Sequence, residues 1–150
     1  MKMKNHIIIS LLFLSVGLCQ QLSEVIETYH NGNIKSITYH KKTRNGIEKV
    51  NEERYFENGQ KKFEGLIRNG DSTGVWISWY DNGQKEKEWT FKDGKQDGSW
   101  THWYENGKKS YEGTFKDGKE DGLGTYWYEN GKKSYEGTFK DGELIQEELY

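Results

Sequence analysis

The sequence contains no proline, no alanine and only one cysteine, and leucine is scarce after residue 20. A single cysteine excludes a disulfide framework within the chain. Without alanine and with little leucine, the best helix formers are missing. The chain instead has 18 glycines, 6 tryptophans, 10 tyrosines and 6 phenylalanines, and aromatic residues favour half-buried strands. We therefore expect an all-β protein in which aromatic rings supply most of the buried area.

The patterns that carry catalysis or metal binding are also missing. There is no Gly-x-Ser-x-Gly, no phosphate-binding loop and no His-x-x-x-His, and the glutamates recur with a repeat, whereas a glycosidase needs singular carboxylates. Asp93, Asp97, Asp117 and Asp121 offer oxygen ligands on glycine-rich loops, but they lack the Asp-x-Asp-x-Asp-Gly alternation of a calcium loop. We predict no enzymatic activity, no metal and no other cofactor. These aspartates are interpreted as turn residues, with calcium binding as the alternative.

The first 19 residues have the three-part layout of a secretory signal peptide. Lys2 and Lys4 precede an apolar run from residue 7 to residue 18, which is too short for a bilayer core that needs ~20 residues. Gly17 and Cys19 allow cleavage before Gln20, which would release a free chain. The alternatives are that Cys19 becomes the lipidated first residue of a lipoprotein, or that the segment is a buried N-terminal strand or helix. We predict export to the periplasm, the outer envelope or the exterior.

The charge of the chain argues against one class of partner. Removal of Lys2 and Lys4 with the signal changes the formal net charge from −2 to −4. A mildly acidic chain with both signs interspersed is a poor candidate for general nucleic-acid binding. We therefore expect no nucleic-acid partner.

Internal repetition defines the rest of the chain. The sixteen residues WYENGKKSYEGTFKDG stand at 103–118 and again, unchanged, at 127–142. An offset of 24 residues, with weaker copies upstream, identifies a repeat protein. Within a domain at 20–150 we place repeats at 29–55, 56–79, 80–103, 104–127 and 128–142, and a three-residue insertion near residues 40–43. A C-terminal cap follows at 143–150, where Glu143, Glu147 and Glu148 are expected to protect the last sheet edge.

Two series of glycine-containing turns alternate along the repeats. Asn-Gly dipeptides have their glycines at Gly32, Gly59, Gly83, Gly107 and Gly131, and Asn-Gly or Asp-Gly dipeptides have theirs at Gly46, Gly70, Gly94, Gly118 and Gly142. Such dipeptides favour two-residue hairpins. The spacing predicts an elongated, single-layer antiparallel meander of about ten strands. For the second series, a tight hairpin and a longer loop both remain open.

A two-residue hairpin at Asn106-Gly107 fixes which residues face one another. It sets Trp100 against Gly113, and the same count one repeat earlier sets Trp76 against Trp89. Facing residues on adjacent strands interact directly. We therefore assign one face as the aromatic core, which includes Trp76, Trp100, Tyr111 and Phe115.

The other face is expected to be mostly polar and to carry one tryptophan per repeat. Trp79, Trp103 and Trp127 should form a row with ~10 Å spacing. Exposed aromatic rings stack on sugars, bind quaternary ammonium groups or mark protein contacts. We interpret this row as the candidate partner-binding site, with simple padding of a thin sheet as the alternative.

Residues 111–131 resemble the MORN (membrane occupation and recognition nexus) repeat, whose pattern is Tyr-x-Gly-x-Trp/Phe followed by spaced glycines. The matching residues are Tyr111, Gly113, Phe115, Gly118, Gly122 and Gly124. Asp121 stands where the family usually has histidine, and tryptophans replace some glycines in earlier repeats. The chain thus resembles a degenerate bacterial variant over about residues 29–142. The resemblance implies an elongated sheet that serves as a binding or assembly scaffold for proteins or membranes, and some bacterial members are labelled as antitoxin components.

Together these observations suggest a monomeric, non-enzymatic, exported scaffold that binds a protein partner. One alternative is binding of a cell-wall glycan, choline or a lipid surface through the tryptophan row. Another is an immunity or antitoxin-like role in the envelope.

Overall fold

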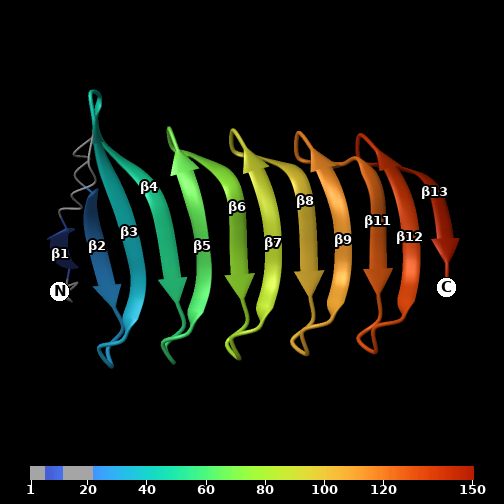
Figure 1. Cartoon of the computed structure of the whole chain (residues 1–150), viewed down its shortest axis with the longest axis horizontal. Coiled ribbons are helices and arrows are strands. Elements are labelled where there is room, and N and C mark those ends of the chain that lie inside the picture. The colour runs from blue at the N-terminus through green and yellow to red at the C-terminus, as the bar shows by residue number, and fades with distance from the viewer. Residues whose placement is uncertain (1–5, 12–21) are drawn as a thin grey trace, which may run out of the picture.

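The structure is a computed structural model that describes residues 6–11 and 22–150. Its strands are β1 (His6–Leu11), β2 (Leu22–Thr28), β3 (Ile34–Thr43), β4 (Gly46–Tyr55), β5 (Lys61–Arg68), β6 (Asp71–Trp79), β7 (Lys85–Lys92), β8 (Lys95–Trp103), β9 (Lys109–Lys116), β10 (Lys119–Glu120), β11 (Gly122–Trp127), β12 (Lys133–Lys140) and β13 (Glu143–Leu149). They form one open antiparallel sheet in chain order (Figure 1), in which the short β10 pairs only with β9. The predicted all-β meander of hairpin repeats is confirmed.

The N-terminal end of the sheet includes part of the predicted signal segment. β1 pairs antiparallel with β2, with Ile8 opposite Val25. Cys19 and the predicted cleavage site before Gln20 lie outside the described residues, so both remain predictions. No helix in the described ranges is long and apolar enough to cross a membrane.

The Asp-Gly turns are tight two-residue hairpins. Lys116 pairs with Lys119, so Asp117 and Gly118 alone connect the two strands. Their φ angles are 50° and 86°, and positive φ at both central residues is the type I′ geometry that matches strand twist. The hairpin between β3 and β4 differs from the others of this series. Its Thr43 pairs with Gly46, and the extra residues of the first repeat lengthen both strands. Its tip extends beyond the other turns along that edge of the sheet (Figure 1).

The Asn-Gly turns are wider than the predicted two-residue hairpins. Tyr104 N donates to Lys108 O at 2.8 Å, and Gly107 N donates to Tyr104 O at 2.9 Å. Gly107 has a positive φ of 79°, and its equivalents Gly59, Gly83 and Gly131 have φ of 87°, 85° and 88°. The asparagines that precede these four glycines do not adopt positive φ. The asparagine side chain explains the difference, because Asn106 Oδ1 accepts from Lys108 N at 3.0 Å and so stabilises a longer turn.

A β-bulge restores the predicted register beyond each wide turn. Trp103 pairs with Lys109, and Ser110 is then passed over, so that His102 faces Tyr111 and Trp100 faces Gly113. The bulge compensates for the longer turn. The facing pairs predicted for the aromatic face are therefore observed. The two-residue turn also predicted that Glu105 faces Lys108 and that Trp103 faces Ser110, and the structure has neither pair.

The aromatic face is a continuous layer of rings. Its ring pairs include Phe63 with Trp76 at 5.0 Å between centroids, Trp100 with Phe115 at 4.9 Å and Tyr111 with Tyr126 at 4.7 Å. Such edge-to-face and tilted contacts are the favoured aromatic geometries.

Burial on this face differs among the predicted core residues. Trp76 and Tyr111 are buried, with 9% and 7% of their surface exposed, while Trp100 and Phe115 stay half-buried. The main contacts of each described strand are with its neighbours in the sheet, and the structure describes no second layer over the rings. The core is consequently one-sided.

Candidate functional site

Aromatic rings and lysines alternate from strand to strand on the face opposite the aromatic core. The wide Asn-Gly turn sets Trp103 against Lys109, and the equivalent turns set Trp79 against Lys85 and Trp127 against Lys133. We call this row the aromatic–lysine ladder. Its members, in spatial order, are Tyr55, Lys61, Trp79, Lys85, Trp103, Lys109, Trp127, Lys133 and Tyr150. At ~4.8 Å per strand the ladder is about 38 Å long.

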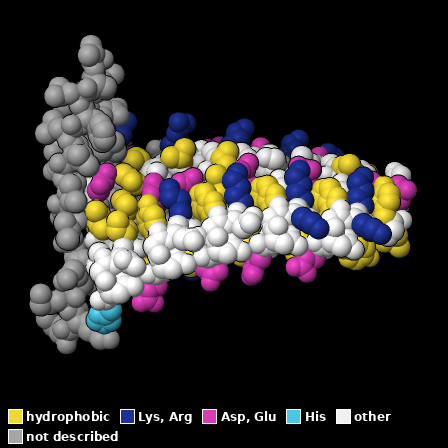
Figure 2. Space-filling view, turned by 60° about the horizontal axis from the view of Figure 1, so that its bottom comes forward, with side chains coloured by type: hydrophobic (Ala, Val, Ile, Leu, Met, Phe, Trp, Pro, Cys, Tyr) yellow, Lys and Arg dark blue, Asp and Glu magenta, His cyan; other side chains and the backbone are white. Residues whose placement is uncertain are grey.

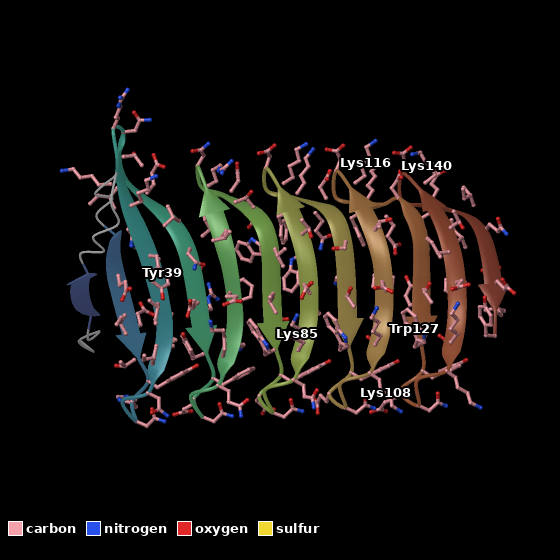
Figure 3. All side chains as sticks on the ribbon, viewed as in Figure 1. Tyr39, Lys85, Lys108, Lys116, Trp127 and Lys140 are labelled. Atoms are coloured by element: carbon pink, nitrogen blue, oxygen red, sulfur yellow. The ribbon has the colours of Figure 1, made fainter. Side chains whose placement is uncertain are left out.

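The figures show the ladder as a line across the sheet. In Figure 2, yellow hydrophobic side chains alternate with dark blue lysines along one level of the exposed face. Figure 3 places Lys85 on β7 and Trp127 on β11 at a similar level, near the ends of the strands that lead to or from the wide turns. Acidic side chains lie below this line, along the turn edge (Figure 2).

Each lysine of the ladder forms an ion pair with a glutamate three residues later in its own strand. The Nζ to carboxylate distances are 2.8 Å for Lys61–Glu64, 2.5 Å for Lys85–Glu88, 2.6 Å for Lys109–Glu112 and 2.5 Å for Lys133–Glu136. In a regular strand, residues three apart point to opposite faces. Where β7, β9 and β12 follow a wide turn, the β-bulge inserts one residue between lysine and glutamate, as Ser110 does in β9, and brings both to the same face.

The lysines also lie against the aromatic rings. Lys61 Nζ is 6.0 Å from the Tyr55 ring centroid and 5.9 Å from that of Trp79, and Lys85 Nζ is 5.7 Å from that of Trp103. These distances are in the range of cation–π attraction. The row predicted as exposed tryptophans is half-buried, and lysine ammonium groups lie over the rings of Trp79 and Trp103.

The C-terminal residue completes the ladder. Lys133 Nζ lies 5.2 Å from the Tyr150 ring centroid, and Tyr150 Oη donates to Glu136 Oε2 at 2.6 Å. Hydrogen bonds from Lys133 and then Tyr150 hold the pKa of Glu136 below its usual value, and the bond to Glu136 raises the pKa of Tyr150 to about 12. The ladder thus ends on a ring that is tied to the last lysine–glutamate pair.

Side-chain bonds between successive wide turns hold the ladder positions in line. Asn82 Nδ2 donates to Glu105 O at 3.1 Å, and Asn106 Nδ2 donates to Glu129 O at 3.1 Å. Tyr80 Oη donates to Trp103 O at 2.7 Å, so a ring in one turn binds the backbone of a ladder residue in the next hairpin. These bonds repeat from hairpin to hairpin and fix the spacing of the turns.

Comparison with known families assigns this architecture. Residues 111–133 and 135–144 match the MORN repeat, and residues 72–93 and 96–117 match the MORN repeat variant. This chain is a MORN repeat protein. No curated protein matches the chain closely enough to count as a relative. MORN repeats are generally interaction repeats for proteins or membranes, and the family is of a non-catalytic scaffold type.

Three of the four loop aspartates, Asp97, Asp117 and Asp121, have side-chain partners within the chain. Lys140 Nζ donates to Asp121 Oδ2 at 2.8 Å, and that hydrogen bond lowers the pKa of Asp121. Asp97 Oδ2 accepts from the backbone N of Asp117 at 3.4 Å. No group of three or more His, Cys, Asp or Glu residues in the described ranges could hold a metal ion. His30, His40 and His102 lie in different elements, a turn, β3 and β8.

Sequence reasoning missed the lysines of the aromatic–lysine ladder. The predicted two-residue turn set Trp103 opposite Ser110, one residue away from its observed partner Lys109. The available signal was the recurrence of Lys61, Lys85, Lys109 and Lys133 at the repeat interval of 24 residues. It could be interpreted only once the turn size was known.

Proposed function

We propose that this MORN repeat protein is a non-enzymatic scaffold that is exported and binds a protein partner through the aromatic–lysine ladder. The observation that supports it is the continuity of the ladder across successive repeats on an open face. A band of rings and charges about 38 Å long, at ~4.8 Å per strand, suits an extended partner surface better than a small ligand.

The chemistry of the ladder favours contact with a protein. Tryptophan and tyrosine are the residues that most often anchor protein interfaces. When a partner excludes water, a lysine without a counter-charge would be costly to bury. Here Lys85 and Lys109 already have Glu88 and Glu112 within 2.6 Å, so the rings can be covered without leaving these charges unpaired.

The same geometry gives less support to choline or glycan binding by the tryptophan row. A quaternary ammonium cage and a sugar platform both need free ring faces. Lys61 and Lys85 already lie over Trp79 and Trp103 at 5.9 and 5.7 Å. A ligand at these rings would have to displace the lysines from both the rings and their glutamates.

Export is the part of the proposal that the N-terminal sequence supports. The positively charged start and the short apolar run at residues 7–18 are typical of a signal peptide. N-terminal sequencing of the chain recovered from an envelope fraction tests it. A start at Gln20 supports a free exported chain, a lipid-modified Cys19 supports an anchored one, and an intact Met1 in the cytoplasm contradicts export.

Two matched tryptophan variants test the ladder. Trp103→Ala removes a half-buried ring from the ladder, and Trp89→Ala removes a half-buried ring from the opposite face. We expect affinity purification from an envelope extract to recover the same protein with the unmodified chain and with Trp89→Ala, and to lose it with Trp103→Ala. Circular dichroism must show that both variants keep the sheet. Loss of the partner with Trp89→Ala alone would place the interface on the aromatic face and contradict the assignment of the ladder as the binding surface.

A further inference from the structure

A pocket on the aromatic face combines rings with an acidic side chain. It has a volume of about 440 Å³ and is lined by Trp100, His102, Tyr111, Phe115, Glu120 and Tyr126. This volume falls within the roughly 300–1,000 Å³ of small-molecule sites. Because Trp100 and Trp103 lie three residues apart in β8, the pocket opens on the face opposite the ladder. It is therefore separate from the proposed partner surface.

The rings form the walls of the pocket. The Trp100 ring centroid lies 5.3 Å from that of Tyr111 and 4.9 Å from that of Phe115, and the Tyr111 and Tyr126 centroids are 4.7 Å apart. Gly113 makes space for the Tyr111 side chain, since a Cβ at Gly113 would lie 2.0 Å from the Tyr111 hydroxyl oxygen. Parts of several rings therefore line one small volume.

Hydrogen bonds hold the Glu120 carboxylate among these rings. Tyr111 Oη donates to Glu120 Oε1 at 2.5 Å, and Tyr126 Oη approaches the same oxygen at 3.5 Å. Glu120 forms none of the ion pairs found among the described residues. Lys87, which lies opposite His102 in the sheet, is engaged with Glu86 at 3.2 Å. The carboxylate charge is thus left without a cationic partner.

The neighbouring titratable groups do not cancel this charge. Burial and then the bond to Glu120 raise the pKa of Tyr111, and burial followed by the Glu120 charge raises the pKa of Tyr126 to about 12. Both tyrosines therefore stay protonated near neutral pH. Burial lowers the pKa of His102, and the Lys87 charge lowers it further, so its imidazole is neutral there. The pocket carries one negative charge surrounded by rings.

This arrangement occurs once in a chain that otherwise repeats. One repeat earlier, Gln96 stands at the place of Glu120 and Lys87 at the place of Tyr111; one repeat later, Leu144 stands at the place of Glu120. The glutamates paired with the ladder lysines, by contrast, recur in four of the five repeats, as Glu64, Glu88, Glu112 and Glu136. A carboxylate that occurs once among aromatic rings departs from the repeat pattern, as expected for a binding site and not for a residue that only supports the repeated fold.

We propose that this pocket binds a trimethylammonium group, with the rings of Trp100, Tyr111 and Tyr126 around the methyl groups and Glu120 as the counter-charge. A quaternary ammonium cation has no N–H to donate and is weakly hydrated, so π faces and one carboxylate provide what it needs. A primary ammonium would lose hydrogen bonds to water that the rings do not replace. The group can belong to free choline or to a choline lipid headgroup, which share this chemistry.

The test is calorimetric titration of the full chain with choline. Its uncharged carbon isostere, dimethylbutanol, and ethanolamine serve as comparison ligands. We expect choline to bind and dimethylbutanol to bind at least about tenfold more weakly, since loss of a desolvated cation–π and ionic contact costs about that factor. Ethanolamine keeps the charge but should also bind at least about tenfold more weakly, because the rings do not replace the hydrogen bonds that its ammonium group forms with water. No binding of choline, or equal binding of dimethylbutanol, would overturn the proposal.

Two glutamate variants locate the site. Glu120→Gln keeps the shape and removes the charge, and Glu112→Gln removes a glutamate of the same repeat on the other face. We expect Glu120→Gln to weaken choline binding by about tenfold and Glu112→Gln to leave it unchanged. Equal effects of the two variants would contradict the assignment. Sedimentation with phosphatidylcholine vesicles, against phosphatidylglycerol vesicles, distinguishes a lipid headgroup from free choline, and binding in neither form rejects the site.

Discussion

The tyrosines of the wide turns allow a sharp test of how the repeats are joined. Tyr29, Tyr80 and Tyr104 each donate from Oη to a backbone carbonyl in the next hairpin, at 2.7 Å in every case. Phe56 occupies the same place in the second repeat and has no hydroxyl to donate. The acceptor equivalent to Trp103 O in that repeat is Trp79 O. One junction of the array therefore lacks a bond that its neighbours form.

Phe56→Tyr should supply the missing bond and stabilise the protein. The ring is half-buried and lies 5.1 Å from Lys62 Nζ, contacts that tyrosine can retain. A new neutral hydrogen bond contributes about 0.5–1.5 kcal/mol net. For a chain of this size, 1 kcal/mol raises the midpoint of thermal unfolding by about 2–4 °C. Phe56→Tyr is therefore expected to raise the midpoint by about that amount.

The reverse substitution is the matched control. Tyr80→Phe removes the bond to Trp103 O and should lower the midpoint by a similar amount. Both midpoints are measured by circular dichroism on the same purified chain, and the double variant should return close to the starting value because the junctions are separate. If Tyr80→Phe destabilises while Phe56→Tyr has no effect, then the equivalence of the two junctions is wrong.

Three further changes test the packing, the turns and the pH response. Gly65→Ala should cost roughly 1–3 kcal/mol of unfolding free energy, because a Cβ there lies 2.2 Å from the Trp76 ring; a neutral result in urea unfolding would mean that this ring is free to move. Asn82→Ala removes a bond within its turn and one to the next turn and should cost about 1–2 kcal/mol of unfolding free energy. Asn130→Ala removes only the bond within the last turn and should cost less. Equal losses of unfolding free energy would argue against a contribution from the bond between turns. Burial lowers the pKa of His102 in the folded state, so the unfolded chain takes up the proton first and stability falls as pH drops below ~6.5. His102→Gln should make the midpoint of thermal unfolding depend less on pH in this range. An unchanged pH dependence would refute the role of His102.

The turns show where sequence reasoning succeeded and where it failed. The first dipeptide series was predicted to form two-residue hairpins, and the second was left open between a tight hairpin and a longer loop. In the structure the tight hairpins belong to the second series, as at Asp117-Gly118. In the Asn-Gly series the side chain of Asn106 binds the backbone two residues later, and this local bond competes with the tight turn. The facing pairs of the aromatic face were nevertheless predicted correctly, because the bulge at Ser110 restores the count that the longer turn had shifted.

The two faces were predictable to different degrees. Alternation along the strands separates Trp100 from Trp103 whatever the turn size, so the two sets of rings could be assigned to opposite faces. The partner of Trp103 depends on the position of the bulge, which no single dipeptide reveals. The Glu120 pocket was also beyond sequence reasoning, since it requires knowing that Glu120 lies beside Tyr111 and Tyr126.

The asparagine bonds between wide turns run in one direction, from the side-chain amide to a backbone carbonyl of the hairpin that follows. A copied unit of 24 residues would therefore bring a donor for the junction after it and an acceptor for the junction before it. Duplication can lengthen such an array without any new mutation at the join. The two identical segments at 103–118 and 127–142 are what a recent event of this kind would leave behind.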